Sequence, residues 1–364
     1  MSLTANIITN LNDVSSIEKP WQDLSESISE NTDFFASYAY TKAYLTHYKP
    51  KDWFIVAIYD ADKQMQAIFP LQRFNLIHDE KHQFSACKSI GVPFLTYIEF
   101  PIRSKLRREV ITFLLNAVLR QYLHIDLVFF WPMHESSKLY LTLLEDMGRD
   151  PALKVDRYAN NLNEIETRSQ SFAEYSKTHR LLTFKDAAYN QRKLTKRGAV
   201  IIQTHKDTSI LYQVIKNLCH MHEQRFNTQH VYLGCADWPE YLSSLFAQLV
   251  PIGCAELTYL MFNEQVICSG LCFLHKKRRY FYLYDFDKNF KSYSPGKIMM
   301  NHLIQKTFEE NGVFCFGVGD YGYKQDWGQT VGEIKSAIVF LNPQARPILE
   351  ECLTPAGIKR ITAF

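Results

Sequence analysis

The chain has 364 residues, more than one hydrophobic core usually organises, so its length predicts two domains. Hydrophobic residues make up 46% of it and glycine and proline are sparse, which excludes collagen-like, low-complexity and intrinsically disordered chains. Lysine and arginine number 41 against 38 aspartates and glutamates, and a net charge of +3 gives no general field for nucleic acid or an anionic membrane. We therefore expect no nucleic-acid partner.

The cysteines and histidines give no sign of a metal site. None of the eight cysteines forms a Cys-x-x-Cys pair, and most lie in apolar segments, as reduced thiols in the core of a cytoplasmic protein do. His220 and His222 are two residues apart, so on a helix they point in different directions. The first residues lack the cationic and apolar blocks of a signal peptide, and no apolar run reaches the ~18 residues that span a bilayer. We expect no metal and no membrane insertion.

The first half of the chain alternates helical and β-prone segments. Apolar residues three and four apart indicate helices, and short apolar runs bounded by turn residues indicate strands. The predicted helices are Ser15 to Ile28, Tyr38 to Tyr48, Ser104 to Tyr122 and Ser137 to Met147. The predicted strands are Trp53 to Tyr59 and Met65 to Arg73, joined as a hairpin, then Ile125 to Trp131 and Leu153 to Tyr158.

The second half repeats this order of elements without obvious sequence identity. Its predicted helices are Phe184 to Lys196, Ile210 to Phe226, Pro239 to Leu249 and Pro295 to Glu310. Its predicted strands are Ala199 to Gln203, Cys254 to Phe262, Gln265 to Leu274, Arg279 to Phe286, Val313 to Phe316 and Gly332 to Leu341. Tight turns join three of these strands into an antiparallel meander, which turns parallel where a strand–helix–strand unit follows.

The repeated order predicts a mixed α/β (α+β) fold built from two copies of one domain. Each copy is expected to have a mixed, mostly antiparallel central sheet flanked by helices. We place the joint near Asn160 to Gln170, which divides the chain into residues 1–165 and 166–364.

A sharply defined helix start is predicted after the last strand of the meander. Ser294 is a good helix cap, Pro295 suits the first helical position, and Gly296 lets the backbone approach a ligand closely. Lys297 puts a cation in the first turn, where the helix dipole alone disfavours it by ~0.3–1 kcal/mol, and a bound phosphate or pyrophosphate reverses that sign. Lys291 lies just upstream. A solvated loop with ordinary surface lysines explains these residues equally well.

A second candidate site is the run from Gly317 to Gly328, which leaves the end of a predicted buried strand. It holds Asp320, Tyr323, Lys324 and Trp327 among four glycines, a mixture too polar for a core and too aromatic for a plain linker. Loops at the carboxyl ends of strands in α/β sheets line ligand crevices, so the run predicts a site. The alternative is a packed turn whose aromatic rings cover the core.

These segments together resemble the GNAT acyltransferase superfamily, and within it the tandem-domain branch called BioF2-like or CelD-like, which is similar to the FemABX peptidyl transferases. Three marks carry the resemblance: Tyr-Ser-Pro-Gly ending at Gly296, Gly-Asp-Tyr-Gly-Tyr-Lys-Gln-Asp-Trp-Gly beginning at Gly319, and His-Glu-Gln-Arg-Phe beginning at His222. The likeness covers most of Phe34 to Gln329 and implies two tandem GNAT-like domains.

The resemblance implies N-acyl transfer, in which an amine of a small molecule or cell-envelope precursor attacks an acyl thioester directly. Acyl-CoA is the expected co-substrate. Simple acetyltransferases wrap its pyrophosphate with an Arg/Gln-x-x-Gly-x-Gly/Ala loop, of which this chain keeps Gly296 but has Ile298 at the last place. The expected donor-binding residues are Lys291, Tyr293, Ser294, Gly296 and Lys297.

The resemblance also implies how the reaction is catalysed. Backbone N–H groups of the splayed strand Arg279 to Phe286 polarise the thioester carbonyl. Asp285 or Asp320 takes the proton of the amine, with Glu256 behind them, although Asp285 can equally be a residue that caps its own turn. Tyr323 protonates the leaving thiolate, because the pKa of a phenol, ~10, suits a thiol better than the pKa of a carboxylic acid does.

Lys324 is expected to hold an anionic part of the donor or acceptor, and His222, Arg225 and Trp327 to contact the substrate. A polar helix end is the alternative for His222 and Arg225. The first half has neither the Pro-Gly helix start nor the Tyr-Lys run, so we expect a degenerate copy that shapes the acceptor cleft without catalysis. Two other functions stay open: FemABX-like transfer from aminoacyl-tRNA, against which the modest net charge argues, and a catalytically inactive descendant that binds a ligand.

Overall fold

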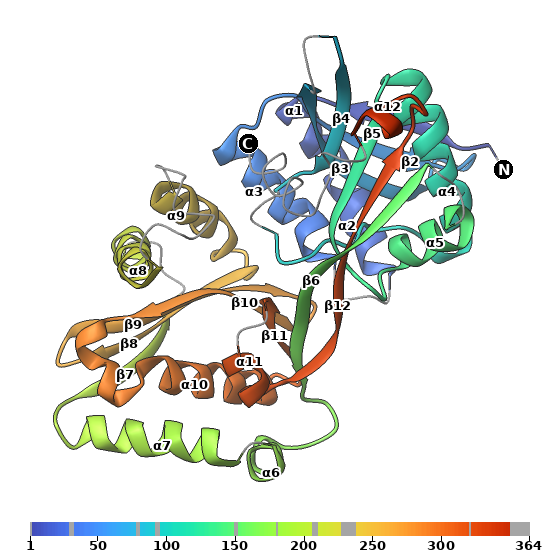
Figure 1. Cartoon of the computed structure of the whole chain (residues 1–364). Helices are drawn as coiled ribbons and strands as arrows, with labels where there is room; N and C mark the ends of the chain where they lie inside the picture. Colours follow the sequence, from blue (N-terminus) through green and yellow to red (C-terminus); the bar gives the residue numbers. More distant parts are fainter. Residues whose placement is uncertain are drawn as a thin grey trace. The chain divides into compact units, whose positions relative to one another are not determined.

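A computed structural model of the chain describes residues 2–28, 33–77, 81–91, 95–148, 152–179, 181–205, 210–226, 238–319 and 322–349. These residues form two compact units (Figure 1). The first unit takes the chain up to Asn161 and includes the described residues from Gly332 onward, and the second runs from Leu162 to Val331. The first boundary lies close to the division predicted after residue 165, but the last strand of the chain belongs to the first unit.

The first unit has a mixed sheet with the strand order β1-β2-β3-β4-β5-β12. Its strands are β1 (Thr4–Ile8), β2 (Trp53–Tyr59), β3 (Met65–Ile77), β4 (Gln83–Ser89), β5 (Leu127–His134) and β12 (Gln329–Phe340). Its helices are α1 (Leu11–Val14), α2 (Glu18–Glu26), α3 (Tyr38–Tyr48), α4 (Arg107–Phe113), the π-helical turn Leu114–Tyr122, α5 (Lys138–Met147) and α12 (Ala345–Leu349). Neighbouring strands are antiparallel except β4 and β5, which are parallel.

The second unit repeats this plan with the strand order β7-β8-β9-β10-β11-β6. Its strands are β7 (Val200–His205), β8 (Ala255–Phe262), β9 (Gln265–His275), β10 (Arg278–Phe286), β11 (Val313–Val318) and the last five residues of β6 (Leu153–Glu166), which begins in the first unit. Its helices are α6 (Phe172–Thr178), α7 (Leu181–Thr195), α8 (Leu211–Phe226), α9 (Trp238–Leu249), α10 (Pro295–Glu309) and α11 (Gly322–Trp327). Here β10 and β11 are the parallel pair, so the prediction that the meander turns parallel at its end is confirmed.

The predicted mixed fold and most of its elements are confirmed, and α3 has the predicted bounds. Within the segment predicted as the joint, Asn160 to Gln170, the chain is a strand as far as Glu166, where β6 ends. Two polar residues of this segment have partners in the second unit. Glu164 forms an ion pair with Arg278, and Asn163 Oδ1 accepts a hydrogen bond from Thr330 at 3.1 Å.

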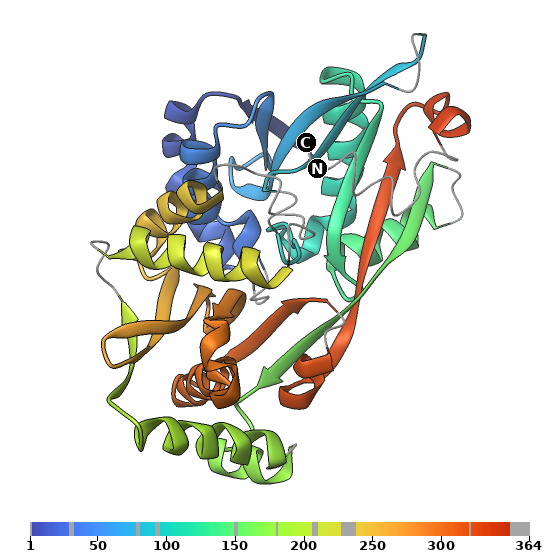
Figure 2. The ribbon, with the colours of Figure 1, turned by 60° about the vertical axis from the view of Figure 1, so that its left-hand side comes forward.

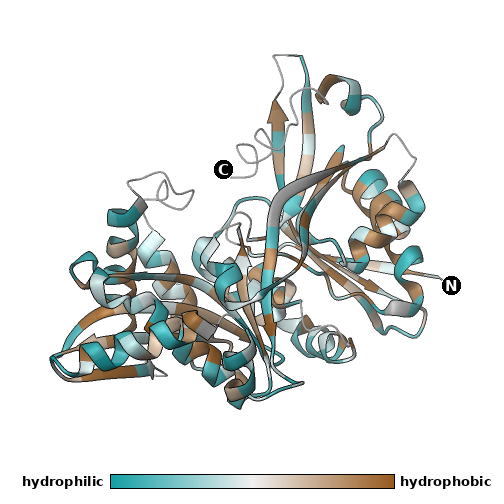
Figure 3. Ribbon diagram, turned by 60° about the horizontal axis from the view of Figure 1, so that its bottom comes forward, coloured by the Kyte–Doolittle hydropathy of each residue, from teal (hydrophilic) through white to brown (hydrophobic). Residues whose placement is uncertain are grey.

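Helices cover both faces of the sheet in the second unit. Figures 1 and 2 place α8 and α9 on one side of β8 to β10, and α10 with α7 on the other. Hydrophobic residues follow the strands (Figure 3), and Phe281, Tyr284 and Phe286 of β10 pack against the core that α7 and α10 share with the sheet. Side chains of a strand alternate between faces, so Asp285 points toward α8 instead.

The described residues contain no helix that is both long and apolar enough to cross a membrane. The six described cysteines are free thiols, and all but Cys254 are buried, which fits the expectation of reduced core thiols. Cys235 and Cys352 lie outside the described residues.

Candidate active site

The parallel strands β10 and β11 diverge within the second unit. Their pairing covers only Arg278 to Tyr280 opposite Val313 to Cys315, whereas β10 continues to Phe286. A bulge between Phe281 and Leu283 distorts β10 at the point where the pairing stops, as bulges do when they increase the local twist. The splayed strand implied by the resemblance is therefore present. Beyond the pairing, no described strand bonds to that edge of β10.

The N–H groups of β10 point alternately to its two edges, and the N–H of Tyr284 points into this opening. The Asp287 N–H donates to the Ile267 carbonyl oxygen at 2.9 Å, across the antiparallel pair with β9. Because successive amides of a strand point in opposite directions, those of Tyr284 and Phe286 point away from β9. The Phe286 N–H donates to Asp285 Oδ1 at 3.0 Å. Among the described residues past the bulge, the Tyr284 amide is therefore the backbone donor that faces the opening.

The helix α10 begins beside the opening, with Pro295 in its first turn as predicted. The prediction that Ser294 caps the helix with its side chain is wrong. Ser294 holds the cap position, but its backbone is left-handed, with φ 48°, and its hydroxyl makes no capping hydrogen bond. The amides of Lys297 and Ile298 already donate to the Ser294 carbonyl oxygen, at 2.9 and 3.3 Å. Since proline has no N–H, Gly296 supplies the one uncommitted amide of this described first turn.

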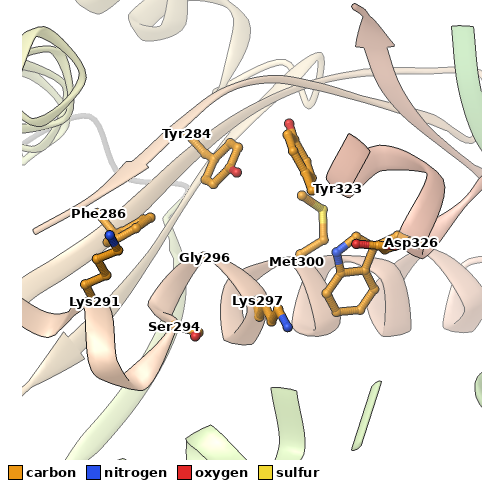
Figure 4. A pocket seen from close by; sticks show the side chains of 10 residues that line it. Tyr284, Phe286, Lys291, Ser294, Gly296, Lys297, Met300, Tyr323 and Asp326 are labelled. Carbon is orange, nitrogen blue, oxygen red and sulfur yellow. The ribbon is translucent and has the colours of Figure 1, made fainter. Parts of the chain in front are cut away.

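A cavity of about 270 Å³ lies between β10, the start of α10 and α11 (Figure 4). Its lining residues are Tyr284, Phe286, Lys291, Ser294, Gly296, Lys297, Met300, Tyr323, Asp326 and Trp327. The backbone at Gly296 approaches β10 closely, because a Cβ atom there would lie 3.1 Å from Tyr284 Cε2 and 3.6 Å from Phe286 Cδ1. The structure thus brings the predicted helix start and the predicted Tyr-Lys run to one cavity.

The run predicted as a site loop contains a short helix, α11. Tyr323 is half-buried on this helix, and its ring lies 5.9 Å from that of Tyr284 in an edge-to-face arrangement above the start of α10 (Figure 4). Trp327 is mainly a core residue, because its ring packs 5.0 Å from Phe184 and its carbonyl oxygen accepts the Tyr175 hydroxyl at 2.7 Å.

Two other residues predicted in this run are not seen to line the cavity. Lys324 is buried, and its Nζ donates to the carbonyl oxygens of Gly317 and Val318 at 3.1 and 2.9 Å, so it ties α11 to the end of β11. A role in holding an anionic substrate stays a prediction. Asp320 lies outside the described residues.

The predicted donor-binding lysines line the cavity mouth. Lys291 and Lys297 both lie in its wall, and Lys297 Nζ also forms an exposed ion pair with Asp186 of α7 at 3.0 Å. Tyr293 is not among the lining residues. Its ring lies beneath Lys193 Nζ of α7, 5.0 Å from the ring centroid, so it joins α7 to the turn before α10.

Asp285, a predicted base, lies on the α8 face with the two residues predicted to contact substrate. Its Oδ2 is 3.1 Å from His222 Nδ1, and its Oδ1 is 3.4 Å from an Arg225 guanidinium nitrogen. Burial alone would lower the pKa of Arg225, but the charge of Asp285 and the nearby Tyr284 outweigh it and raise that pKa. Arg225 also lies 5.8 Å from the ring centroids of Tyr284 and Phe286, so it connects this cluster to the cavity wall.

Glu256, expected behind the candidate bases, sits in a buried ionic cluster. Its carboxylate accepts hydrogen bonds from Arg279 at 2.7 Å and from Lys306 at 2.6 Å. Burial would raise the pKa of Glu256, but these two cations overcome that effect and lower it. A carboxylate held ionised by two cations is a poor proton acceptor, so its role here is structural. In the part of the chain that the structure describes, no three His, Cys, Asp or Glu residues gather as metal ligands.

Residues 183–325, which include every named wall residue of the cavity except Asp326 and Trp327, match the family model described as acetyltransferase (GNAT) domain. This segment is therefore similar to GNAT domains. No curated protein sequence matches the chain. Three solved structures, one of them a tandem GNAT protein, share the fold of the whole chain.

FemX aligns at 12% identity with a TM-score of 0.62, over 96% of this chain and 100% of its own. L-PGS from Bacillus licheniformis aligns at 11% identity with a TM-score of 0.55, over 95% of this chain and 97% of its own. The tandem GNAT protein from the clavulanic acid biosynthesis pathway aligns at 7% identity with a TM-score of 0.52, over 94% of this chain and 99% of its own.

Some wall residues of the cavity are assigned no role by the sequence predictions. Tyr284 and Phe286 flank Asp285 in β10, so their side chains share the opposite face, and this alternation could have found them. Met300 lies about one turn after Gly296 on the same helix, and this spacing predicts that the two residues share a helix face. Asp326 belongs to the run from Gly317 to Gly328 that predicts a site, although the sequence assigns it no role of its own.

Proposed function

We propose that the chain is an N-acyltransferase that moves an acyl group from a thioester to an amine. The observation that carries the proposal is the cavity at the opening of β10, where the Tyr284 amide, Gly296 and Tyr323 meet in a GNAT domain. The nitrogen lone pair attacks the carbonyl carbon, the C–S bond breaks, and the proton lost by the amine balances the one taken up by the thiolate. The products are an amide and a free thiol.

The donor occupies the α10 side of the opening in this proposal. The Tyr284 amide points where the carbonyl oxygen gains negative charge, and one well-placed donor of this kind contributes ~2.7–4 kcal/mol to catalysis. The phenol of Tyr323 stands beside Tyr284 and protonates the departing sulfur. Lys291, Lys297 and the Gly296 amide face the anionic end of acyl-CoA, the proposed co-substrate.

The amine is proposed to approach from the α8 side, where Asp285 and His222 lie. An imidazole whose Nδ1–H donates to a carboxylate carries its basic lone pair on Nε2, the arrangement that makes histidine a general base. Asp285 is then a positioning residue and His222 the proton acceptor. Arg225 contacts the same carboxylate and the Tyr284 ring in the cavity wall, so it holds Asp285 and His222 in position relative to β10.

Release of free thiol tests the proposal. The purified chain is incubated with acyl-CoAs of several lengths and a panel of amines, including amino sugars of cell-envelope precursors, and amine-dependent thiol release is expected. Lys277→Gln, in an exposed turn outside the cavity, serves as the matched control for site variants. A complete lack of thiol release, with no thermal shift from coenzyme A, contradicts the proposal. If deletion of the gene causes a growth defect that the wild-type chain rescues and cavity-filling variants do not, the chain is instead a catalytically inactive protein that binds a ligand.

Aminoacyl transfer from charged tRNA is the second candidate function. The likeness to FemX over 96% of this chain favours it. The first turn of α10 also favours it, because its single free amide provides few hydrogen-bond donors for a pyrophosphate. Here the amine attacks an aminoacyl ester, and a ribose hydroxyl leaves in place of the thiol. Binding of charged tRNA that weakens steeply with added salt supports this candidate, and a failure to bind even at low salt removes it.

A further inference from the structure

The solvent side of α7 carries an exposed stripe of large apolar and basic side chains. Leu182, Lys185, Tyr189, Arg192 and Lys196 follow one another at intervals of three and four, the spacing that puts residues on one helix face. All five are exposed, Leu182 by 76% and Tyr189 by 59%. The Lys196 amide donates to the Arg192 carbonyl oxygen at 3.1 Å, so the last residue continues the helical path.

The stripe is not needed to hold α7 in place. The opposite side of the helix supplies Phe184, Ala187 and Leu194 to the core beneath it. None of the stripe's three cations forms an ion pair with another described residue. Three cations and two exposed apolar residues on one helix face give that face a charge complementary to an acidic partner.

Contacts of α7 fix the stripe beside the mouth of the cavity. Asp186 pairs with Lys297 in the cavity wall, and Lys193 Nζ donates to the Ser292 carbonyl oxygen at 3.4 Å in the turn before α10. Asp186 and Lys193 precede and follow the middle of the stripe, Tyr189. A partner seated on this face of α7 therefore lies near the cavity wall formed by Lys297.

The helix start limits the phosphates that the entrance can bind. A pyrophosphate needs several donors, yet the first turn of α10 offers only the Gly296 amide, with Lys291 and the already paired Lys297 nearby. This set suits a single phosphodiester better than a pyrophosphate. A phosphopantetheine arm attached to a protein has one phosphate, whereas coenzyme A has a pyrophosphate.

We propose that the α7 stripe docks an acidic carrier protein, which presents the acyl group on a phosphopantetheine arm to the cavity. This inference rests on the proposed N-acyl transfer. The amine attacks the arm's thioester carbonyl, the C–S bond breaks, and the carrier's thiol regains a proton. An acidic protein surface with apolar residues between its charges complements Leu182 and Tyr189 as well as the cations. Nucleic acid fits less well, because tight binding to it engages many phosphates and the stripe offers three cations.

A binding experiment tests the docking surface without relying on catalysis. The full chain is titrated with an acyl carrier protein of fatty-acid synthesis in its phosphopantetheine form, and binding that weakens with added salt is expected. The variant Arg192→Gln/Lys196→Gln should weaken that binding about tenfold, as removal of charges from an interface rim does. The matched control, Lys216→Gln/Lys277→Gln, removes two exposed cations of the same unit away from α7. No binding, or equal loss in both variants, overturns the docking surface.

A transfer experiment compares two donors with the same acyl group, octanoyl-carrier protein and octanoyl-CoA. We expect a higher kcat/KM for the carrier-bound donor, and the stripe variant should lower this preference about tenfold through KM. An equal loss for both donors, or stripe-dependent binding of tRNA or phosphatidylglycerol vesicles in place of the carrier, overturns the inference. If the carrier binds through the stripe but neither donor yields product, the proposed function fails while the docking surface stands.

Discussion

Gly296 allows a sharp test of where the donor lies. The substitution Gly296→Ala puts a Cβ 3.1 Å from Tyr284 Cε2, a few tenths of an ångström inside ordinary contact, and the half-buried ring can yield by turning into the cavity. Alanine also favours the helix by at most about 1 kcal/mol. These effects oppose each other, so we expect the free energy of unfolding to stay within about 1 kcal/mol of the wild type.

The larger substitution Gly296→Leu places a whole side chain in the 270 Å³ cavity. We expect kcat/KM for the thioester donor to fall about tenfold in the alanine variant and at least about a hundredfold in the leucine variant, which corresponds to roughly 2.7 kcal/mol. Thiol release gives the rates, and urea unfolding checks that each variant is folded. Gly322→Leu is the control, because a Cβ there meets no atom within 4 Å. A folded Gly296→Leu enzyme with wild-type kcat/KM refutes this placement of the donor.

Three further predictions concern catalysis and stability. Tyr323→Phe should lower kcat by about a hundredfold with little change in KM, measured as thiol release, and an unchanged kcat excludes Tyr323 as the acid. Arg279→Met should lower the free energy of unfolding in urea by about 3–5 kcal/mol, because it leaves the buried carboxylate of Glu256 short of a partner; a loss below 1 kcal/mol contradicts this account. Burial raises the pKa of Glu99 to about 7, so the folded chain binds the extra proton and stability should fall as pH rises from about 4.3 to about 7. Glu99→Gln should remove up to about 3 kcal/mol of this fall, and identical pH profiles of the two proteins sink the prediction.

The sequence predicts most of the second unit because its signals are local. Tight turns and β-branched or aromatic runs mark β8, β9 and β10, and Pro295 marks the start of α10. The place of β12, the last strand of the chain, in the sheet of the first unit could not be predicted from such local signals. The pairing of β12 with β5 depends on Ile338 and Phe340 packing with Leu127 and Phe129, residues about two hundred positions away in the chain.

The sequence predicts which segments form the candidate site, but not how each of their side chains is oriented. The meeting of Gly296 and Tyr323 follows from the order of strands, helix and turn. The orientation of Lys324 does not, because its burial against two carbonyl oxygens depends on how α11 packs after β11. The left-handed backbone of Ser294 is likewise fixed by the helical turn before it, which removes the side-chain cap that serine commonly supplies.

The two units show what turns this fold into a site. Both have a meander that ends in a parallel pair, β4 with β5 and β10 with β11. In the first unit the pairing reaches Lys88 and β4 ends at Ser89, so one residue of the strand extends past its neighbour. In the second unit β10 continues from Tyr280 to Phe286 without its neighbour. A carbonyl can reach a strand amide only where that amide is not already bonded across the sheet, so the extra length of β10 restricts the proposed chemistry to the second unit.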